Sequence, residues 1–125
     1  MTTFNRKYLL AGMAGVMAAG ISAGAMAADI RVGITMRMIS ENGQRYGQMV
    51  MDEFDMINKA GGINGNTIEV FLLDDQCKPD IGVANVNRFI HQNKVHLVVG
   101  STCSSVSMPI VPVTEKAKVA QIIPH

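Results

Sequence analysis

The chain has 125 residues, of which 48% are hydrophobic and 17% charged. This composition supports a buried core and argues against general disorder, while the length fits one domain and leaves no room for two complete lobes with a cleft between them. The formal net charge of +1, without clustered Lys and Arg, argues against nucleic acid as a partner.

The first 27 residues have the pattern of a secretory signal peptide. Arg6 and Lys7 precede an uncharged, apolar run that ends in Ala25-Met26-Ala27. A charged start, an apolar run and an A-x-A cleavage site are the parts of such a signal. A retained membrane anchor is the alternative, but the run is rich in Ala and Gly and only weakly apolar. We expect cleavage after Ala27 and a mature domain of residues 28–125.

A strand and an amphipathic helix are predicted to open the mature chain. Residues 30–36 alternate apolar with small or polar side chains and are rich in branched residues, which predicts a strand. A turn cluster follows at 40–43. Apolar residues then recur at spacings of four, four and three, which predicts a helix that ends at the glycines 61–62; these are Tyr46, Val50, Phe54 and Ile57.

Strands and helices continue to alternate after this helix. Strands are predicted at 67–73, 95–99 and 119–123, a helix from Pro79, and a second helix at 106–118 that Pro109 and Pro112 disturb. Short connections between alternating elements predict an α/β fold with a doubly wound, mainly parallel sheet. In such a sheet, ligands bind beyond the carboxyl ends of the strands, which directs attention to loops 37–43, 74–78 and 100–105.

Several segments in a fixed order resemble one family. After the signal peptide come residues 29–34 (DIRVGI), 57–65 (INKAGGING), 74–79 (DDQCKP) and 100–105 (GSTCSS). Together they resemble the leucine/isoleucine/valine-binding proteins, which are type I periplasmic solute-binding proteins of ATP-binding-cassette (ABC) importers. Family members close two lobes on a ligand. The resemblance therefore implies that residues 28–125 are an incomplete amino-terminal lobe, and we expect a truncated product.

The resemblance also implies a function. It implies a periplasmic protein that binds a branched-chain or other amino acid, or a similar small carboxylate, and delivers it to the permease subunits of an importer without a cofactor or a metal. A ligand-sensing or interaction module of the same fold is the alternative. An enzyme is not expected, because no nucleophile, base and orienting group can be assembled. An incomplete lobe should not trap ligand alone, because its loops leave most of the ligand in water.

Cys77 and Cys103 are the only cysteines, and both lie in predicted loops at the same end of the sheet. An exported protein meets an oxidising compartment, so we expect a disulfide between them. The resemblance implies the same pairing. A metal site would need further ligands, and a redox pair more typically has two residues between its cysteines.

Ser104 and Ser105 directly follow Cys103, where the next helix can begin. Their hydroxyls and the unpaired amides of a helix start favour a carboxylate, but capping of the helix is the commoner role of such serines. From the residues alone, capping is preferred. The resemblance reverses that order and implies that Ser104 contacts the ligand, with Ser105 as a weaker candidate.

The loop at 38–43 departs from the family, whose members carry a Ser/Thr-Gly-Pro stretch and then an aromatic-Gly pair whose ring lines the pocket. Either Tyr46-Gly47 or Asn42-Gly43 can be matched to that pair. The first match makes Tyr46 a ligand contact, and the second makes it an ordinary core residue of the helix.

The acidic pair and the histidines have plainer interpretations. Asp74 and Asp75 end a strand and should point to opposite faces, so we expect hydrogen bonding of the disulfide loop rather than shared chemistry. His91 and His96 are expected at the surface or at helix ends.

Overall fold

A computed structural model describes residues 30–124. The predicted signal peptide, residues 1–27, lies outside the described residues. The elements, in chain order, are β1 (Ile30–Met36), α1 (Glu41–Lys59), β2 (Ile68–Asp74), α2 (Pro79–Arg88), the π-helical turn η1 (Phe89–Asn93), β3 (Leu97–Gly100), α3 (Ser104–Ala117) and β4 (Ala120–Ile122). Within this part of the chain, no helix combines the length and the apolar character that crossing a membrane would require.

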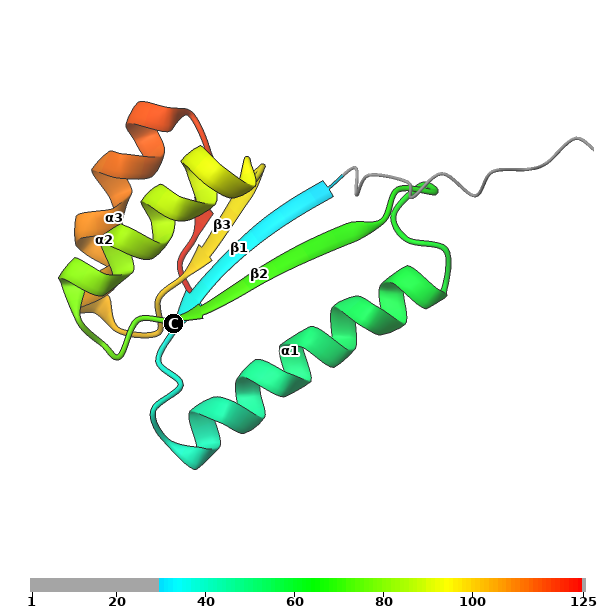
Figure 1. The fold of residues 1–125 in the computed structure, drawn as a ribbon, viewed down its shortest axis with the longest axis horizontal. Coiled ribbons are helices and arrows are strands. Elements are labelled where there is room, and N and C mark those ends of the chain that lie inside the picture. Colours follow the sequence, from blue (N-terminus) through cyan, green and yellow to red (C-terminus); the bar gives the residue numbers. More distant parts are fainter. Residues whose placement is uncertain (1–29, 125) are drawn as a thin grey trace, which may run out of the picture.

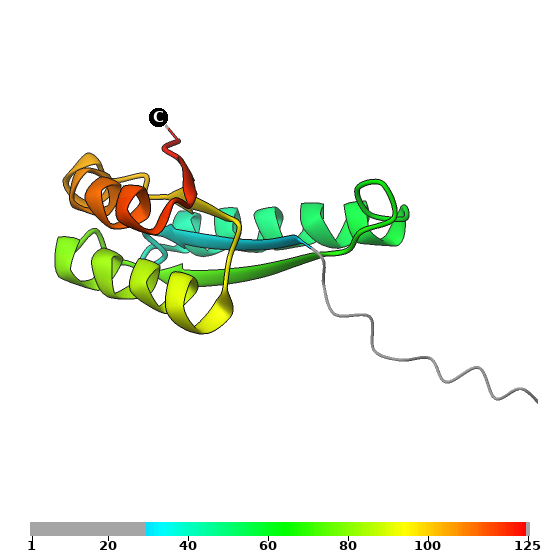
Figure 2. The same ribbon diagram turned by 90° about the horizontal axis from the view of Figure 1, so that it is seen from above.

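The four strands form one sheet in the order β2-β1-β3-β4, and every neighbouring pair is parallel. Helix α1 covers one face of the sheet, and α2 and α3 lie side by side on the other (Figures 1 and 2). This arrangement follows from right-handed crossovers: the chain moves outward from β1 to β2, and then back past β1 to β3 and β4. The predicted doubly wound, parallel α/β fold is confirmed.

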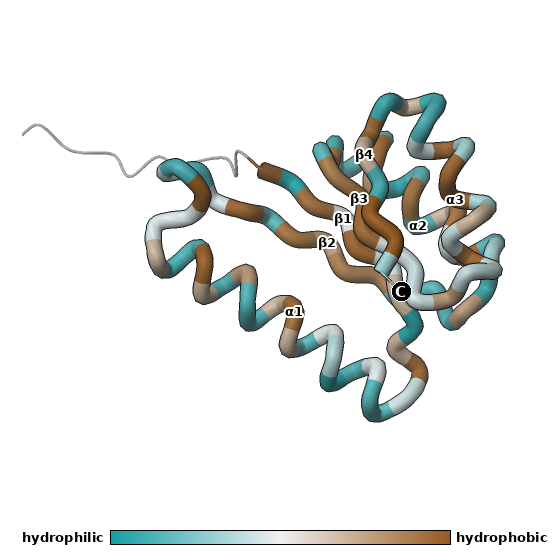
Figure 3. The backbone as a smooth tube through the Cα atoms, turned by 180° about the vertical axis from the view of Figure 1, so that it is seen from behind, coloured by the Kyte–Doolittle hydropathy of each residue, from teal (hydrophilic) through white to brown (hydrophobic). Residues whose placement is uncertain are grey.

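Each face of the sheet has its own hydrophobic core. Strand β1 supplies most of the fully buried residues beneath α1, and the helix adds Val50, Phe54 and Ile57. The opposite core has more buried residues and lies between the sheet, α2 and α3; these are Val86, Phe89, Val95, Val98, Val106 and Ile110. The strands are mostly hydrophobic along their length, whereas α1 alternates between hydrophobic and hydrophilic (Figure 3). A sheet covered on both faces needs this continuous apolar character.

The close packing of α2 on α3 depends on one glycine. Gly82 is buried in α2, and a Cβ atom at this position would stand 2.2 Å from Cγ1 of Val106. That separation is far below van der Waals contact, so any side chain would force the helices apart. Gly82 therefore sets how closely the two helices approach.

Helix α3 differs from the prediction, because it runs through Pro109 and Pro112 without a break. Each proline removes one backbone donor, which leaves the carbonyl four residues earlier without its helical partner. Those carbonyls belong to Ser105 and Met108, which are both exposed. Water can therefore take the place of the missing donors, and the helix continues.

The strand boundaries shift by one or two residues, most clearly at β3. Strand β3 was expected from Val95 but begins at Leu97, after the unpredicted turn η1. Lys94 ends this turn in the left-handed conformation, with φ of 54°, and the Val95 amide donates to the carbonyl of Phe89. Val95 is thus buried as the residue that closes the turn, and not as part of the strand.

Candidate functional site

The strand order reverses between β1 and β3, and the predicted site lies at the carboxyl ends of these strands. Beyond β1 the chain turns to α1 on one face, and beyond β3 it turns to α3 on the other. The loop after β2 lies next to them, because Met36 of β1 is in register with Asp74 of β2. This divergence of the chain is where open α/β sheets bind ligands.

A disulfide joins two of these loops. The sulfur atoms of Cys77 and Cys103 are bonded at 2.03 Å, and the Cα atoms are 5.7 Å apart. Cys77 belongs to the loop after β2, and Cys103 is the N-cap residue of α3. The bond therefore ties the start of α3 to the loop between β2 and α2.

Asp75 holds the same edge together through hydrogen bonds. Its side chain is fully buried. One carboxylate oxygen accepts from the backbone amide of Cys77 at 2.8 Å, and the other accepts from the Thr35 hydroxyl at 3.2 Å. Asn85 of α2 donates to the same hydroxyl, at 3.1 Å. One carboxylate thus connects β1 to the disulfide loop, and the shared hydroxyl extends this network to α2.

Asp74 acts on the other side of the loop. Its Oδ1 atom accepts from the amide of Met38 at 2.9 Å and from the amide of Gln76 at 2.8 Å. The two neighbouring carboxylates share no hydrogen-bond partner, and each fixes loop backbone, as expected. In residues 30–124, no cluster of three or more His, Cys, Asp and Glu side chains is arranged to hold a metal ion.

Ser104 and Ser105 form the first turn of α3 and are exposed. Neither caps the helix, since Cys103 occupies the N-cap position and makes no side-chain cap bond. The amides of Val106 and Ser107 donate to the carbonyl of Cys103, while those of Ser104 and Ser105 donate to no acceptor among the described residues. The expected capping role is therefore wrong. Two hydroxyls and two free amides are available at the edge of the sheet.

Two further serines shape this loop, and the sequence reasoning missed them. The Ser107 hydroxyl donates to the carbonyl of Ser101 at 2.8 Å and accepts from the amide of Ser101 at 2.6 Å. The Ser101 hydroxyl in turn accepts from the amide of Cys103 at 3.1 Å. Both residues are buried, so they hold the loop from inside. The only sign of this arrangement in the sequence is that a polar residue, Ser107, stands between apolar residues in the predicted helix.

Tyr46 projects from α1 and is 45% exposed. It does not join the core beneath α1, so its assignment to the apolar side of the helix is wrong. The buried position is Gly47, where a Cβ atom would stand 3.0 Å from Sδ of Met38 and 3.3 Å from Leu72. A glycine here lets α1 approach the sheet, which turns the neighbouring ring toward solvent.

Other charged and titratable side chains have local partners or lie at the surface. The Arg45 guanidinium pairs with Glu41 one helical turn away, at 2.9 Å. Arg37 is exposed at the end of β1. His91 is exposed on η1, and the imidazole Nδ1 of His96 accepts from the amide of Arg31 at 3.0 Å. The histidines therefore lie at the surface, as expected.

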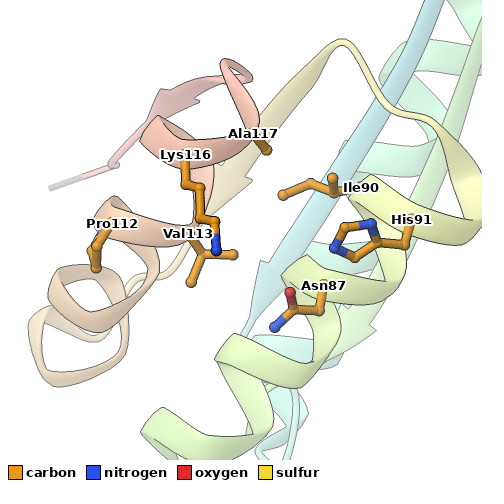
Figure 4. A pocket seen from close by; sticks show the side chains of 7 residues that line it. All are labelled: Asn87, Ile90, His91, Pro112, Val113, Lys116 and Ala117. Carbon is orange, nitrogen blue, oxygen red and sulfur yellow. The ribbon is translucent and has the colours of Figure 1, made fainter.

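A hollow between α2, η1 and α3 is separate from this site. Its volume is about 430 Å³, and it is lined by Asn87, Ile90, His91, Pro112, Val113, Lys116 and Ala117 (Figure 4). These residues belong to the last turns of the helices, at the opposite end of α3 from Ser104. Lys116 occupies the last turn of α3, where its positive charge complements the exposed carbonyls of the helix end.

Comparison with known proteins identifies the family. The sequence profile described as "periplasmic binding protein" matches residues 29–124. The chain belongs to this family. An amino acid binding protein of Pseudomonas aeruginosa is 35% identical over 124 residues, which cover 97% of this chain and 32% of the relative. The leucine-specific-binding protein of Salmonella typhimurium is 33% identical over 116 residues, which cover 90% of this chain and 31% of the relative.

Solved structures of periplasmic binding proteins share the fold. The branched-chain amino acid transporter substrate binding protein LivJ from Streptococcus pneumoniae, in complex with isoleucine, superposes with a TM-score of 0.69 at 28% identity. The match covers 76% of this chain and 28% of LivJ. The present periplasmic binding protein chain therefore spans about a third of the length of the relatives that it matches.

Proposed function

We propose that this chain is part of the solute-binding component of an ABC importer and that it binds a branched-chain or related amino acid. The relatives support this proposal, because they are named for binding amino acids or leucine, and LivJ was crystallised with isoleucine. The chain acts in the periplasm after its signal peptide is removed, has no enzymatic activity, and passes its solute to permease subunits. Residues 28–125 supply part of the amino-terminal lobe.

One observation carries the proposal at the level of atoms: the free start of α3. The amides of Ser104 and Ser105 point out of the first turn of a 14-residue helix, and no described residue accepts from them. Such a helix start carries about half a positive charge. A ligand carboxylate here accepts from both amides and from the Ser104 hydroxyl. The Cys77–Cys103 disulfide keeps these donors in place, which lowers the entropic cost of binding.

Tyr46 lies on α1, whose start is at the same edge of the sheet, and its exposed ring offers an apolar surface to the ligand side chain. The carboxylate and the side chain of an amino acid are then recognised by different elements. Ser105 contributes its amide and is the weaker candidate for a hydroxyl contact. The second lobe of such a protein completes the enclosure, so binding by residues 28–125 alone is weak.

The experiment is a nuclear magnetic resonance titration of the oxidised chain with isoleucine, because this method detects weak binding residue by residue. We expect amide shifts at Ser104 and Ser105 that saturate, and much smaller shifts with isoleucinamide, which lacks the carboxylate. Ser104→Ala should weaken binding by about 1.5–3 kcal/mol, the value of a hydrogen bond to a charged group.

Met108→Ala is the matched control, since Met108 is 66% exposed on α3 outside its first turn. Isoleucine shifts that are absent at the start of α3, or that persist unchanged with isoleucinamide, would contradict the proposed carboxylate site. Equal affinities of the Ser104→Ala and Met108→Ala variants for isoleucine would show that the Ser104 hydroxyl does not contact the carboxylate.

A further inference from the structure

The chain contains two Asn-Gly pairs in very different surroundings: Asn42-Gly43 and Asn64-Gly65. In such a pair, the backbone nitrogen of glycine can attack the side-chain amide carbon of asparagine, because glycine has no side chain to hinder the approach. The attack requires an exposed asparagine, open space around the glycine into which the backbone can rearrange, and a glycine amide that is not held in a hydrogen bond. These requirements separate the two pairs.

The pair at 64–65 meets all three requirements. It lies in the turn between α1 and β2, and both residues are exposed. Asn64 and Gly65 have positive φ angles of 52° and 82°, and no atom lies within 4 Å of the position of a Gly65 Cβ. Ile63 and Asn66 close the base of the turn with two backbone hydrogen bonds of 2.9 Å. The Gly65 amide between them donates to no acceptor among the described residues.

The pair at 42–43 fails the second and third requirements. It lies in the first turn of α1, where the amide of Gly43 donates to the Ser40 hydroxyl at 3.1 Å. A Cβ atom on Gly43 would stand 2.5 Å from the carbonyl oxygen of Arg37, so the backbone is closely packed. Attack on Asn42 would first have to break the cap bond and unwind the turn.

We infer that Asn64 is a site of spontaneous modification through a succinimide. The backbone nitrogen of Gly65 forms a bond to Cγ of Asn64, the bond from Cγ to Nδ2 breaks, and the side-chain nitrogen leaves as ammonia with the proton of the Gly65 amide. Water then adds to either carbonyl of the ring and opens it. The products are aspartate and isoaspartate, and no atom is oxidised or reduced.

The modification changes the turn but not the proposed binding edge. Either product places a carboxylate on a turn that was neutral at this position, and isoaspartate also adds a methylene to the backbone between Ile63 and Asn66. The turn precedes β2, at the amino ends of the strands, whereas Ser104 follows β3 at the carboxyl ends. The product is therefore a charge variant with an altered α1–β2 connection.

The test follows both asparagines in the same unmodified chain. The oxidised chain is incubated at mildly alkaline pH, samples are digested over time, and mass spectrometry with chromatographic separation of aspartate and isoaspartate quantifies each peptide. We expect Asn64 to convert about tenfold faster than Asn42, the factor that corresponds to opening a helix cap. In concentrated urea the two rates should become similar. Equal rates in the folded chain, or faster conversion of Asn42, would overturn the inference.

Two variants test the structural cause separately. Ser40→Ala removes the acceptor of the Gly43 amide and should raise the rate at Asn42 several-fold, without a change at Asn64. Gly65→Ala should lower the rate at Asn64 several-fold and leave Asn42 unchanged. A Ser40→Ala chain that keeps the slow rate at Asn42 would show that the cap bond does not protect it and would refute that part of the inference.

Discussion

Asp75 is the residue whose replacement should perturb the binding edge most. We predict that Asp75→Ala lowers the free energy of unfolding substantially, because it removes the shared acceptor of the Cys77 amide and the Thr35 hydroxyl. Thr35 is fully buried, so its hydroxyl cannot turn to water for a new acceptor. The Cys77 amide is only partly buried and is less affected.

The magnitude follows from these two bonds. A hydrogen bond to a charged group contributes about 1.5–3 kcal/mol, and a buried donor left without an acceptor adds a penalty of similar size. The partial exposure of Cys77 reduces its share, so we expect a loss of about 3–5 kcal/mol. A small domain has about 5–15 kcal/mol in total. Asp75→Asn retains one acceptor oxygen, but its side-chain NH2 group would face either the Thr35 hydroxyl or the Cys77 amide, which are both donors. Its loss of free energy of unfolding should therefore be smaller than that of Asp75→Ala.

Urea unfolding followed by circular dichroism measures the effect on the oxidised chain, with the disulfide intact in every variant. Glu53→Ala is the control, because Glu53 is an exposed carboxylate on α1 without an ion pair among the described residues, and its loss should change the free energy by less than about 0.5 kcal/mol. If Asp75→Ala unfolded within about 1 kcal/mol of the unmodified chain, the buried network would not hold the edge as described.

Three further predictions concern the links between elements. Replacing Cys77 and Cys103 with Ser should lower the free energy of unfolding by about 3–4 kcal/mol for a loop of 26 residues, and an unchanged urea midpoint would contradict this. Gly82→Ala should cost about 1–3 kcal/mol by overpacking; a neutral result in the same assay would mean that the helices separate freely. A hydrogen bond to Asp55 and the charge of Asp55 raise the pKa of Lys59. The stabilisation from this Lys59–Asp55 pair is therefore fully present below the ordinary lysine pKa, and it is lost as the pH rises through the raised pKa of Lys59. Asp55→Asn should return that pKa toward its ordinary value in an NMR titration, and no change would exclude the pair.

Much of the fold was predictable from local patterns. The alternation at 30–36 gave the bounds of β1, and Pro79 marked the first residue of α2. The disulfide could be predicted because the chain has only two cysteines. The opposite directions of Asp74 and Asp75 followed from the two-residue repeat of a strand.

Features that depend on contacts between distant residues could not be predicted. Tyr46 fits the spacing of the apolar residues in α1, but the close contact of Gly47 with Met38 and Leu72 sets the rotation of the helix. The bonds of Ser107 to Ser101 depend on the path of a loop and not on any spacing. The turn η1 likewise reflects the burial of Phe89 against Gly33, where a Cβ atom would stand 2.5 Å from the ring.

The unequal attachment of the helices bears on how the domain opens. Helix α1 packs alone on its face through half-buried side chains, whereas α2 and α3 share a core and the disulfide binds α3 to the loop between β2 and α2. Elements with few buried contacts open at a lower free energy than the whole domain. Amide protons of α1 should therefore exchange with solvent through a partial opening in which α2, α3 and the sheet stay folded. The domain then consists of two cooperative units, and the boundary between them is the face of the sheet that α1 covers.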